Sequence, residues 1–491
     1  MKCSFIISGY KCDEYIFRNI DSILDQDYKD YEIIIVLNGR WQTKDELAGR
    51  LMEKYGEKIN LVSIDTPGLG HSNNVGFGYA IGDIVSFLSS DLYLMPGALR
   101  NWVDAFTEHP DCDFVYSGYR FVSKNPLEVY FSNEFDRYHL ECENYIDGAN
   151  PVRRNAVPKW DEQLKSLIDW DFFLSVTDKG AKGYYIKEPI YFAELPKRGG
   201  LSEDSNANWI VRRSQIQKKH EIPERKICIT SLIDPEYSLE LAKMAEADYR
   251  IYPSFKPHHY DLVYSWGFQC DNDNIQKSTG VFHGYPGHKA IHWIGQDIKS
   301  LMNQRWVDVD FYQQAVLSKI KNHFCLTEME KKNLDRMRIE ADVLYPPVKI
   351  NDLGIKKDAI SINDPELQAQ LTRAMPDQKI LLNDLNCSIT VHFEDKFSNV
   401  LESLCKGNEV ITNAFLSGVH YIQGFTNVPE LRKMLVHAIR KILKDTETIE
   451  QETINWYKQR TDPKAFQRKL EKIAEKPIQK YGRLEDITAN A

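Results

Sequence analysis

The chain has 491 residues, of which 42% are hydrophobic and 27% are charged, a composition typical of globular domains and not of disordered chains. Its 62 Lys and Arg residues against 71 Asp and Glu residues give a formal net charge of −9 at pH 7. This balance disfavours general binding to nucleic acid, although it does not exclude a local basic groove. At about 150 residues per domain, the length predicts two or three domains.

Nine cysteines are scattered along the chain. No pair has the Cys-x-x-Cys spacing of zinc sites or thioredoxin-like motifs, and dispersed cysteines favour reduced, buried thiols and a cytoplasmic protein. No apolar run approaches the roughly 18 residues that would span a bilayer. The short apolar stretch at residues 3–7 favours a buried first strand over a signal segment. The sequence therefore predicts no transmembrane segment.

The first half of the chain alternates strand and helix patterns. Continuous β-rich runs separated by helical stretches predict an α/β domain with a mainly parallel sheet covered on both faces. Ligands of such sheets bind beyond the carboxyl ends of strands, where the sequence has Asn38 and Asp91. The predicted strands are residues 4–7, 31–37, 59–64 and 84–88.

A polar segment at residues 215–225 interrupts this pattern and predicts a domain boundary. A new strand and helix series then begins at Lys226, as expected for a second Rossmann-like module. A weaker boundary falls at Tyr345-Pro346-Pro347, where two prolines end a strand. The charged tail beyond Ile449 is expected to be a solvated helical arm. The predicted domains are residues 1–218, 225–348 and 349–491.

The run Ser89-Ser90-Asp91 follows a predicted strand and precedes Pro96-Gly97-Ala98-Leu99. A nucleotide diphosphate at a sheet edge needs a carboxylate that presents a divalent metal to its oxygens. Glycines, such as those at residues 68–76, allow the backbone to approach such a ligand closely. On spacing alone, however, an aspartate after a strand is more often a turn or capping residue.

Taken in order, the motifs resemble those of family 2 glycosyltransferases of the GT-A fold, over about residues 3–215. The segment Ser22–Tyr28 is similar to the Ser-Leu-x-x-Gln-Thr-Tyr signature of that family, and Ser89–Asp91 stands where the family has its Asp-x-Asp metal motif. The other matching segments are Ser8–Lys11, Leu37–Arg40, Asn73–Gly76, Trp160–Glu162 and Ile168–Asp171.

Several positions depart from the family pattern. Only Asp91 of the metal motif is acidic. Leu37 replaces one of the two acidic residues that usually help to hold the nucleoside in this family, and Asn73 replaces the usual arginine. Ile168 replaces an acidic partner of Asp169, and residues 194–205 contain no histidine where many relatives have a further metal ligand. The sequence therefore leaves metal affinity and donor identity open.

The resemblance implies an inverting glycosyltransferase that uses Mg²⁺ or Mn²⁺. It would move a sugar from a nucleotide-sugar, with a UDP-sugar expected, to a hydroxyl of a glycan or other biopolymer. The implied roles are catalytic base for Asp169 and metal ligand for Asp91. The residues expected to contact the nucleotide are Tyr10, Asn38, Asn73, Ser90 and Asp91.

Three neighbouring features have competing explanations. Asp171 is either functional or a helix cap, with equal support from the sequence. Trp170 is more often a core residue than a sugar platform. Lys197 and Arg198 favour a solvated basic loop over a clamp on the diphosphate.

The second half resembles, more weakly, a GT-B glycosyltransferase of the family 4 type over residues 226–442. The segment Ile291–Asp297 is similar to an acceptor-half His-x-Gly-x-Asp element, although His292 is expected to be structural. Glu394 and Glu402 have the Glu-x7-Glu spacing of residues that face the sugar and the ribose in that family.

The segment between Pro347 and the strand before Glu394 has room for one strand–helix unit and lacks a Gly-rich phosphate loop. We therefore expect a truncated, degenerate GT-B-like half that serves acceptor binding, partner docking or homo-oligomerisation. Two alternatives stay open. A second active site would make the protein bifunctional, and the lost family positions are also compatible with a non-catalytic sugar- or nucleotide-binding protein.

Overall fold

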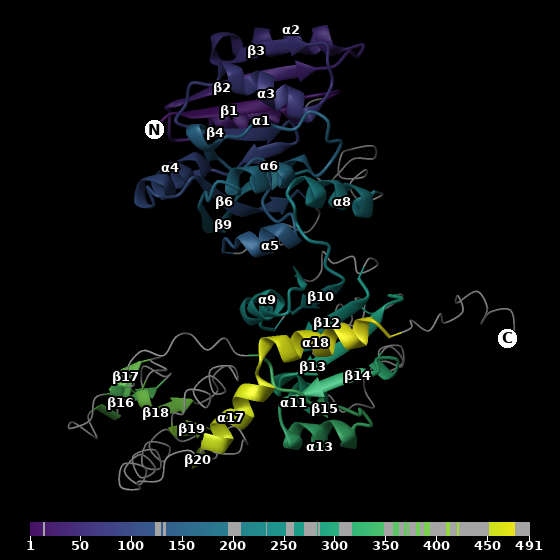
Figure 1. The fold of residues 1–491 in the computed structure, drawn as a ribbon. Helices are drawn as coiled ribbons and strands as arrows, with labels where there is room; N and C mark the ends of the chain where they lie inside the picture. Colours follow the sequence, from purple (N-terminus) through teal and green to yellow (C-terminus); the bar gives the residue numbers. More distant parts are fainter. Residues whose placement is uncertain are drawn as a thin grey trace, which may run out of the picture. The chain divides into compact units, whose positions relative to one another are not determined.

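The computed structural model divides the chain into two compact units, Met1–Glu224 and Arg225–Ala491. The division falls at the end of the polar segment in which the sequence predicts a boundary. Each unit is built from strands and helices in alternation (Figure 1). The structure describes residues 1–12, 15–122, 129–130, 134–194, 208–231, 233–251, 260–269, 282, 285–303, 317–347, 357–362, 368–369, 371–372, 380–382, 387–392, 409–412, 420–421 and 451–476.

Four parallel strands form the first part of the N-terminal sheet, in the order β3-β2-β1-β4. Each is an apolar run of the kind that the sequence predicts. The strands are β1 (Cys3–Gly9), β2 (Tyr31–Asn38), β3 (Asn60–Ile64) and β4 (Ile84–Ser89). The helices that connect them are α1 (Tyr15–Leu24), α2 (Lys44–Tyr55) and α3 (Leu69–Tyr79).

The second part of this sheet is mixed, so the prediction of a mainly parallel sheet is only partly right. Beyond β4 the order is β8-β6-β9-β5, in which β8 is antiparallel to both neighbours and β5 is antiparallel to β9. Strands of two or three residues give no apolar run that a sequence pattern could detect. The short strands are β5 (Leu92–Leu94), β7 (Val129–Tyr130) and β8 (Val152–Arg153), and the two longer strands of this part are β6 (Phe114–Phe121) and β9 (Gly183–Ala193).

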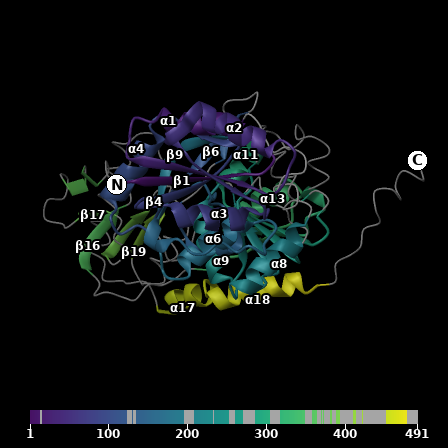
Figure 2. The same ribbon diagram turned by 90° about the horizontal axis from the view of Figure 1, so that it is seen from above.

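The two faces of the sheet carry separate cores, because successive strand residues point to opposite faces. Phe5 and Ile7 of β1 pack in one core, and Ile6 packs in the other. Helices α1, α2 and α4 (Ala98–Glu108) cover the first face. Helices α3 and α6 (Ile168–Thr177) lie on the second (Figure 2). α5 (Arg137–Cys142) and α8 (Trp209–Lys219) also pack on this second face.

The C-terminal unit contains two all-parallel sheets. Their orders are β11-β10-β12-β13-β14-β15 and β17-β16-β18-β19-β20, so each begins in its interior and is wound in both directions, as in Rossmann-like folds. The strands of the first sheet are β10 (Ile227–Thr230), β11 (Asp248–Arg250), β12 (Leu262–Trp266), β13 (His288–Trp293), β14 (Asn322–Cys325) and β15 (Asp342–Val343). Those of the second are β16 (Lys357–Ile362), β17 (Ile380–Leu382), β18 (Cys387–His392), β19 (Glu409–Thr412) and β20 (His420–Tyr421).

Two expectations for this unit are wrong. Two strands, β16 and β17, precede β18 where the sequence suggests a single strand–helix unit, because polar residues interrupt the apolar pattern of β16. In the tail, α18 (Pro463–Ala474) packs against β10 and β12 instead of extending into solvent. Its buried side chains are Phe466, Leu470 and Ile473, and the Phe466 ring lies 5.7 Å from that of Tyr264. The other helices are α9 (Pro235–Met244), α11 (Gln296–Asn303), α13 (Glu328–Arg336) and α17 (Gln451–Arg460).

Among the described residues, no helix is long and apolar enough to cross a membrane.

Candidate active site

The carboxyl ends of β1, β2 and β4 meet at one edge of the N-terminal sheet. The register pairs Ser8 with both Val36 and Ser89, so that the three strands end side by side. Tyr10 follows β1 directly, Asp91 lies two residues beyond the end of β4, and Asn38 ends β2. This edge is where parallel α/β sheets bind ligands.

Helix α1 fixes the turn that carries Asp91. The Asn19 amide donates hydrogen bonds to the carbonyls of Ser89, at 2.9 Å, and of Leu92. The Ser22 hydroxyl accepts the Leu94 N–H at 3.0 Å. Ser90 and Asp91 form the turn between β4 and β5, and the Asp91 side chain is exposed while its carbonyl accepts the Glu194 N–H at 3.2 Å. Asn19 and Ser22 of α1 therefore hold the backbone of the turn that carries the exposed Asp91 carboxylate.

Asn38 and Asn73 are buried, with exposed fractions of 3% and 2%. The Asn38 amide donates to the carbonyl of Gly9 at 3.2 Å, and its oxygen accepts the N–H of Gly68 at 3.2 Å. The Asn73 oxygen accepts the Ser8 hydroxyl at 2.7 Å. Both side chains thus brace the strand ends from inside the fold, and their contact with a nucleotide stays a prediction.

Tyr10 offers an aromatic surface at the same edge. Its side chain is 49% exposed, and its ring meets that of Trp41 edge-on at 5.7 Å. Gly39 has a φ of +79° and lies so close that an added Cβ would approach the Tyr10 ring to 2.7 Å. Glycine at this position therefore allows both the turn and the placement of the ring.

Asp169 lies in the first turn of α6 and is partly exposed. The residue before the helix, Leu167, has the left-handed conformation, with a φ of 56° and a ψ of 32°. The Asp169 carboxylate accepts the N–H of Trp170 at 3.0 Å and a hydrogen bond from the side chain of Asn144. Burial nevertheless raises its pKa above the ordinary value, which makes it a better proton acceptor than an exposed aspartate.

A third carboxylate, Asp147, interacts electrostatically with both predicted site residues. It precedes Gly148 in the loop between α5 and β8, and it accepts the N–H of Ala149 at 2.8 Å. Its pKa is raised to about 7, first by burial and then by the negative charges of Asp169 and Asp91. The fold brings Asp169 against this loop, because a Cβ added at Gly148 would lie 3.5 Å from the Cβ of Asp169. Sequence reasoning missed Asp147, since an Asp-Gly pair in a loop is typical of an ordinary turn.

The carboxylates at this edge of the sheet supply only some of the ligands that a hard divalent cation such as Mg²⁺ needs. Among the described residues, no three His, Cys, Asp or Glu side chains form a group that could hold a metal. Mg²⁺ commonly takes only one or two carboxylates from the protein and its remaining ligands from water and substrate phosphates. The exposed Asp91 carboxylate and Asp147, whose pKa the Asp91 charge helps to raise, fit that pattern, because a bound cation would also offset their mutual repulsion.

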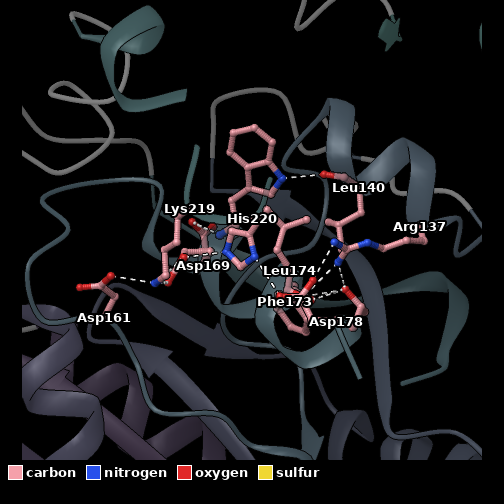
Figure 3. Close-up of polar contacts among 12 residues, drawn as sticks. Arg137, Leu140, Asp161, Asp169, Phe173, Leu174, Asp178, Lys219 and His220 are labelled. Carbon is pink, nitrogen blue, oxygen red and sulfur yellow. Dashed lines mark hydrogen bonds and ion pairs between the residues drawn. The ribbon is translucent and has the colours of Figure 1, made fainter. Parts of the chain in front are cut away.

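An ionic cluster around the buried Asp171 joins α6 to the end of α8, and Lys219, His220 and Asp178 belong to it (Figure 3). Asp171 is neither a helix cap nor exposed to solvent; its carboxylate is 2% exposed and contacts Lys219 and His220 at 2.8 Å each. Trp170, between the two aspartates, is fully buried, and its indole N–H donates to the Leu140 carbonyl at 2.6 Å. The prediction that Trp170 is a core residue is confirmed.

Four other predicted residues, Lys197, Arg198, Glu394 and Glu402, lie outside the described residues. In the C-terminal unit, His292 is fully buried on β13 with its Nδ1 at the hydroxyl of Tyr264. Burial first, and then the charge of Lys469, lowers the pKa of His292 to about 3. The interpretation of His292 as a structural residue agrees with this burial.

Comparison with known proteins identifies the family that one segment of the chain matches. Residues 4–157 match the model of glycosyl transferase family 2, which confirms the resemblance for that segment. An uncharacterized glycosyltransferase of Nostoc sp. is 36% identical over 106 residues, covering 22% of this chain and 33% of that protein. The chondroitin synthase of Pasteurella multocida is 26% identical over 187 residues, covering 36% of this chain and 19% of that protein. The chain thus spans a third or less of the length of these two relatives.

A solved structure, S. aureus TarS 1–349 in complex with UDP-GlcNAc, has 17% sequence identity and covers 64% of this chain and 78% of that one. Its TM-score of 0.34 is too low to establish a shared overall fold. The family match does not extend beyond the N-terminal unit. Within that unit, the ordered motifs and the match at residues 4–157 lead to one assignment: the chain carries a glycosyltransferase domain of family 2.

Proposed function

We propose that the N-terminal unit catalyses the inverting transfer of a sugar from a nucleotide-sugar, with a UDP-sugar as the first donor to test, to a hydroxyl group of a glycan. The observation that carries the proposal is the family 2 match at residues 4–157, in which Asp91 is exposed at a strand end, together with the packing of Asp169 against Gly148, the neighbour of Asp147. The similarity to a chondroitin synthase supports a glycan acceptor.

On the acceptor side, Asp169 would act as the base. Its carboxylate takes the proton of the acceptor hydroxyl while that oxygen forms a bond to the anomeric carbon. The bond from the anomeric carbon to the diphosphate oxygen breaks on the opposite face, and the nucleoside diphosphate leaves with the bonding electrons. Asn144 keeps the carboxylate oriented through its hydrogen bond.

On the donor side, Asp91 and Asp147 would hold Mg²⁺ or Mn²⁺, which, when bound, neutralises charge that develops on the leaving diphosphate. The exposed Tyr10 ring provides a surface for the base of the nucleotide. Ser90, in the same turn as Asp91, can donate its hydroxyl to a phosphate oxygen. Asn38 and Asn73 maintain the strand ends on which these groups depend.

The test is a screen of the full chain against a panel of nucleotide-sugars, with and without Mn²⁺, in the presence of glycan oligosaccharides. We expect one donor to raise the melting temperature, because a ligand that binds only the folded state stabilises it. That donor should release its nucleoside diphosphate only when acceptor is present, and mass spectrometry should find one added sugar. Binding without turnover for every donor would reject the proposal and favour a sugar-binding protein.

We propose that the C-terminal unit supports the transfer without a second catalytic centre. The reason is that His292, the histidine of its glycosyltransferase-like segment, is buried. Glu394→Ala and Asp169→Ala variants, made separately, distinguish the bifunctional alternative. If only the N-terminal unit is catalytic, Asp169→Ala removes every product and Glu394→Ala removes none. Loss of one of two linkages in the Glu394→Ala variant would demonstrate a second centre.

A further inference from the structure

Helix α6 places two carboxylates of its first turn on opposite sides. Asp169 and Asp171 are two residues apart, which corresponds to about 200° around an α-helix. Asp169 is partly exposed, whereas Asp171 is 2% exposed. A fixed contact on the Asp171 side therefore determines how the Asp169 side is presented.

Two consecutive residues at the end of α8 make that contact, the last helical residue Lys219 and the capping residue His220. The Lys219 ammonium lies 2.8 Å and 2.9 Å from the two Asp171 oxygens, and it also reaches Asp161 at 2.7 Å. The His220 Nε2 lies 2.8 Å from Asp171, and its Nδ1 lies 3.0 Å from Asp178, which follows α6 (Figure 3). The histidine thus spans both ends of the helix, and the lysine joins its first turn to the loop at residue 161.

Two further features mark the start of α6, besides the hydrogen bond from Asn144 to Asp169. Leu167 is in the left-handed conformation, which is strained for a leucine, and no side chain caps the helix. The buried Trp170 indole anchors the same turn through its bond to Leu140. At the far end, Arg137 binds the carbonyl of Leu174 at 3.0 Å and Asp178 at 2.9 Å.

We infer that Lys219 and His220 are positioning residues for the reaction: by pairing with the buried Asp171, they hold the first turn of α6 so that Asp169 faces the acceptor hydroxyl. This inference rests on the proposed role of Asp169 as the base. Without the Lys219 ammonium, the buried Asp171 carboxylate must regain water or a proton, and the turn that carries it must shift outward. A displacement of about 1 Å at a reacting group can cost a factor of about 100 in rate.

The decisive variants are Lys219→Met and His220→Gln. We expect kcat to fall roughly 10- to 100-fold in Lys219→Met while KM for the donor stays within about twofold, because the donor contacts lie on other elements. Adding Asp171→Asn to Lys219→Met should recover part of the lost kcat, since a neutral amide no longer needs a cation. A purely structural pair would lower the folded fraction and leave kcat per folded molecule unchanged.

Two controls separate positioning from loss of stability. Lys182→Met removes a lysine from an exposed ion pair with Asp111 at 3.0 Å and should leave kcat unaltered. Arg137→Met loosens the far end of α6 and should lower the melting temperature with less effect on kcat. Wild-type kcat per folded molecule in Lys219→Met, or no recovery in the double variant, would overturn the inference.

A readout without catalysis keeps this test independent of the proposed function. Hydrogen exchange of a peptide covering residues 166–177 should be faster in Lys219→Met than in wild type, and unaltered in Lys182→Met. If wild type transfers no sugar, the proposed function fails, and faster exchange in this peptide would still establish that Lys219 orders the turn. Unaltered exchange in an active enzyme rejects the positioning role alone.

Discussion

Carboxylates near strand ends have opposite surroundings in the two units. In the N-terminal unit, Asp91 is exposed and Asp169 is partly exposed. In the C-terminal unit, Asp297 is 2% exposed and accepts three backbone N–H groups, those of Phe268, Ile294 and Ile298 at 2.8–3.0 Å. Glu330 likewise accepts the N–H groups of Leu326 and Thr327 at 2.9 and 3.0 Å.

The difference shows that the same residue types can have two roles, which are to stabilise a turn or to remain accessible to a substrate. A carboxylate that is surrounded by backbone donors stabilises a turn, and few of its lone pairs remain for a ligand. Burial raises the pKa of Asp297 and of Glu330 to about 7, although their hydrogen bonds act in the other direction. Asp91 and Asp169 of the N-terminal unit keep their access to solvent and therefore to substrate.

The largest expected effect comes from the base. Asp169→Asn should reduce transfer by roughly 10²- to 10⁴-fold, because an amide cannot accept the proton of the acceptor hydroxyl. Binding of the donor, measured by calorimetry, should be preserved. The matched variant Asp297→Asn should retain transfer per folded molecule. Turnover near the wild-type rate in Asp169→Asn would contradict the base assignment.

The next effect concerns the metal. Asp91→Ala should weaken binding of UDP in the presence of Mn²⁺ by roughly 10- to 100-fold, since one carboxylate ligand is lost from the cation. Titration calorimetry measures this change, and Glu330→Gln in the C-terminal unit is its control. Equal heats of binding for wild type and Asp91→Ala would exclude Asp91 as the metal ligand.

The contrast also explains which features can be predicted from sequence. The apolar runs of β1, β2 and β4 are long enough to reveal the strands and the edge at which Asp91 lies. The short strands β5 and β8 give no comparable pattern, so the mixed half of the sheet is not predictable. Asp147 approaches the site from a loop, and only the fold brings it near Asp91 and Asp169.

Ion-pair partners are equally hidden from the sequence. Asp171 has the appearance of a helix cap or a substrate ligand, because both roles place an aspartate in a first turn. Its partners, Lys219 and His220, lie almost fifty residues away at the end of another helix. Pattern and spacing describe neighbours along one element, whereas this cluster depends on how two helices pack.

A third prediction concerns stability in the C-terminal unit. Asp297→Ala should lower the free energy of unfolding by about 1–3 kcal/mol, because buried N–H groups of Phe268 and Ile294 lose their acceptor. Thermal unfolding followed by tryptophan fluorescence measures the loss. Asp91→Ala should have little effect in the same assay, since its side chain is exposed. Equal melting temperatures for wild type and Asp297→Ala would break the contrast between the two units.

The smallest effect is a pH dependence confined to the C-terminal unit. Burial lowers the pKa of His292 to about 3, so between pH 6.5 and 3 the unfolded chain binds a proton that the folded chain does not. Stability from this residue is therefore complete above pH 6.5 and declines as the pH falls, by about 0.7 kcal/mol between pH 7 and pH 6. His292→Asn, whose side-chain oxygen can still accept the Tyr264 hydroxyl, should lose this component of the slope. Asp297 and Glu330 act in the opposite direction, because their raised pKa values favour the folded state as the pH falls toward 4. Only the difference between variant and wild type isolates the histidine, and a difference that is constant from pH 5 to pH 8 would mean that His292 titrates alike in both states.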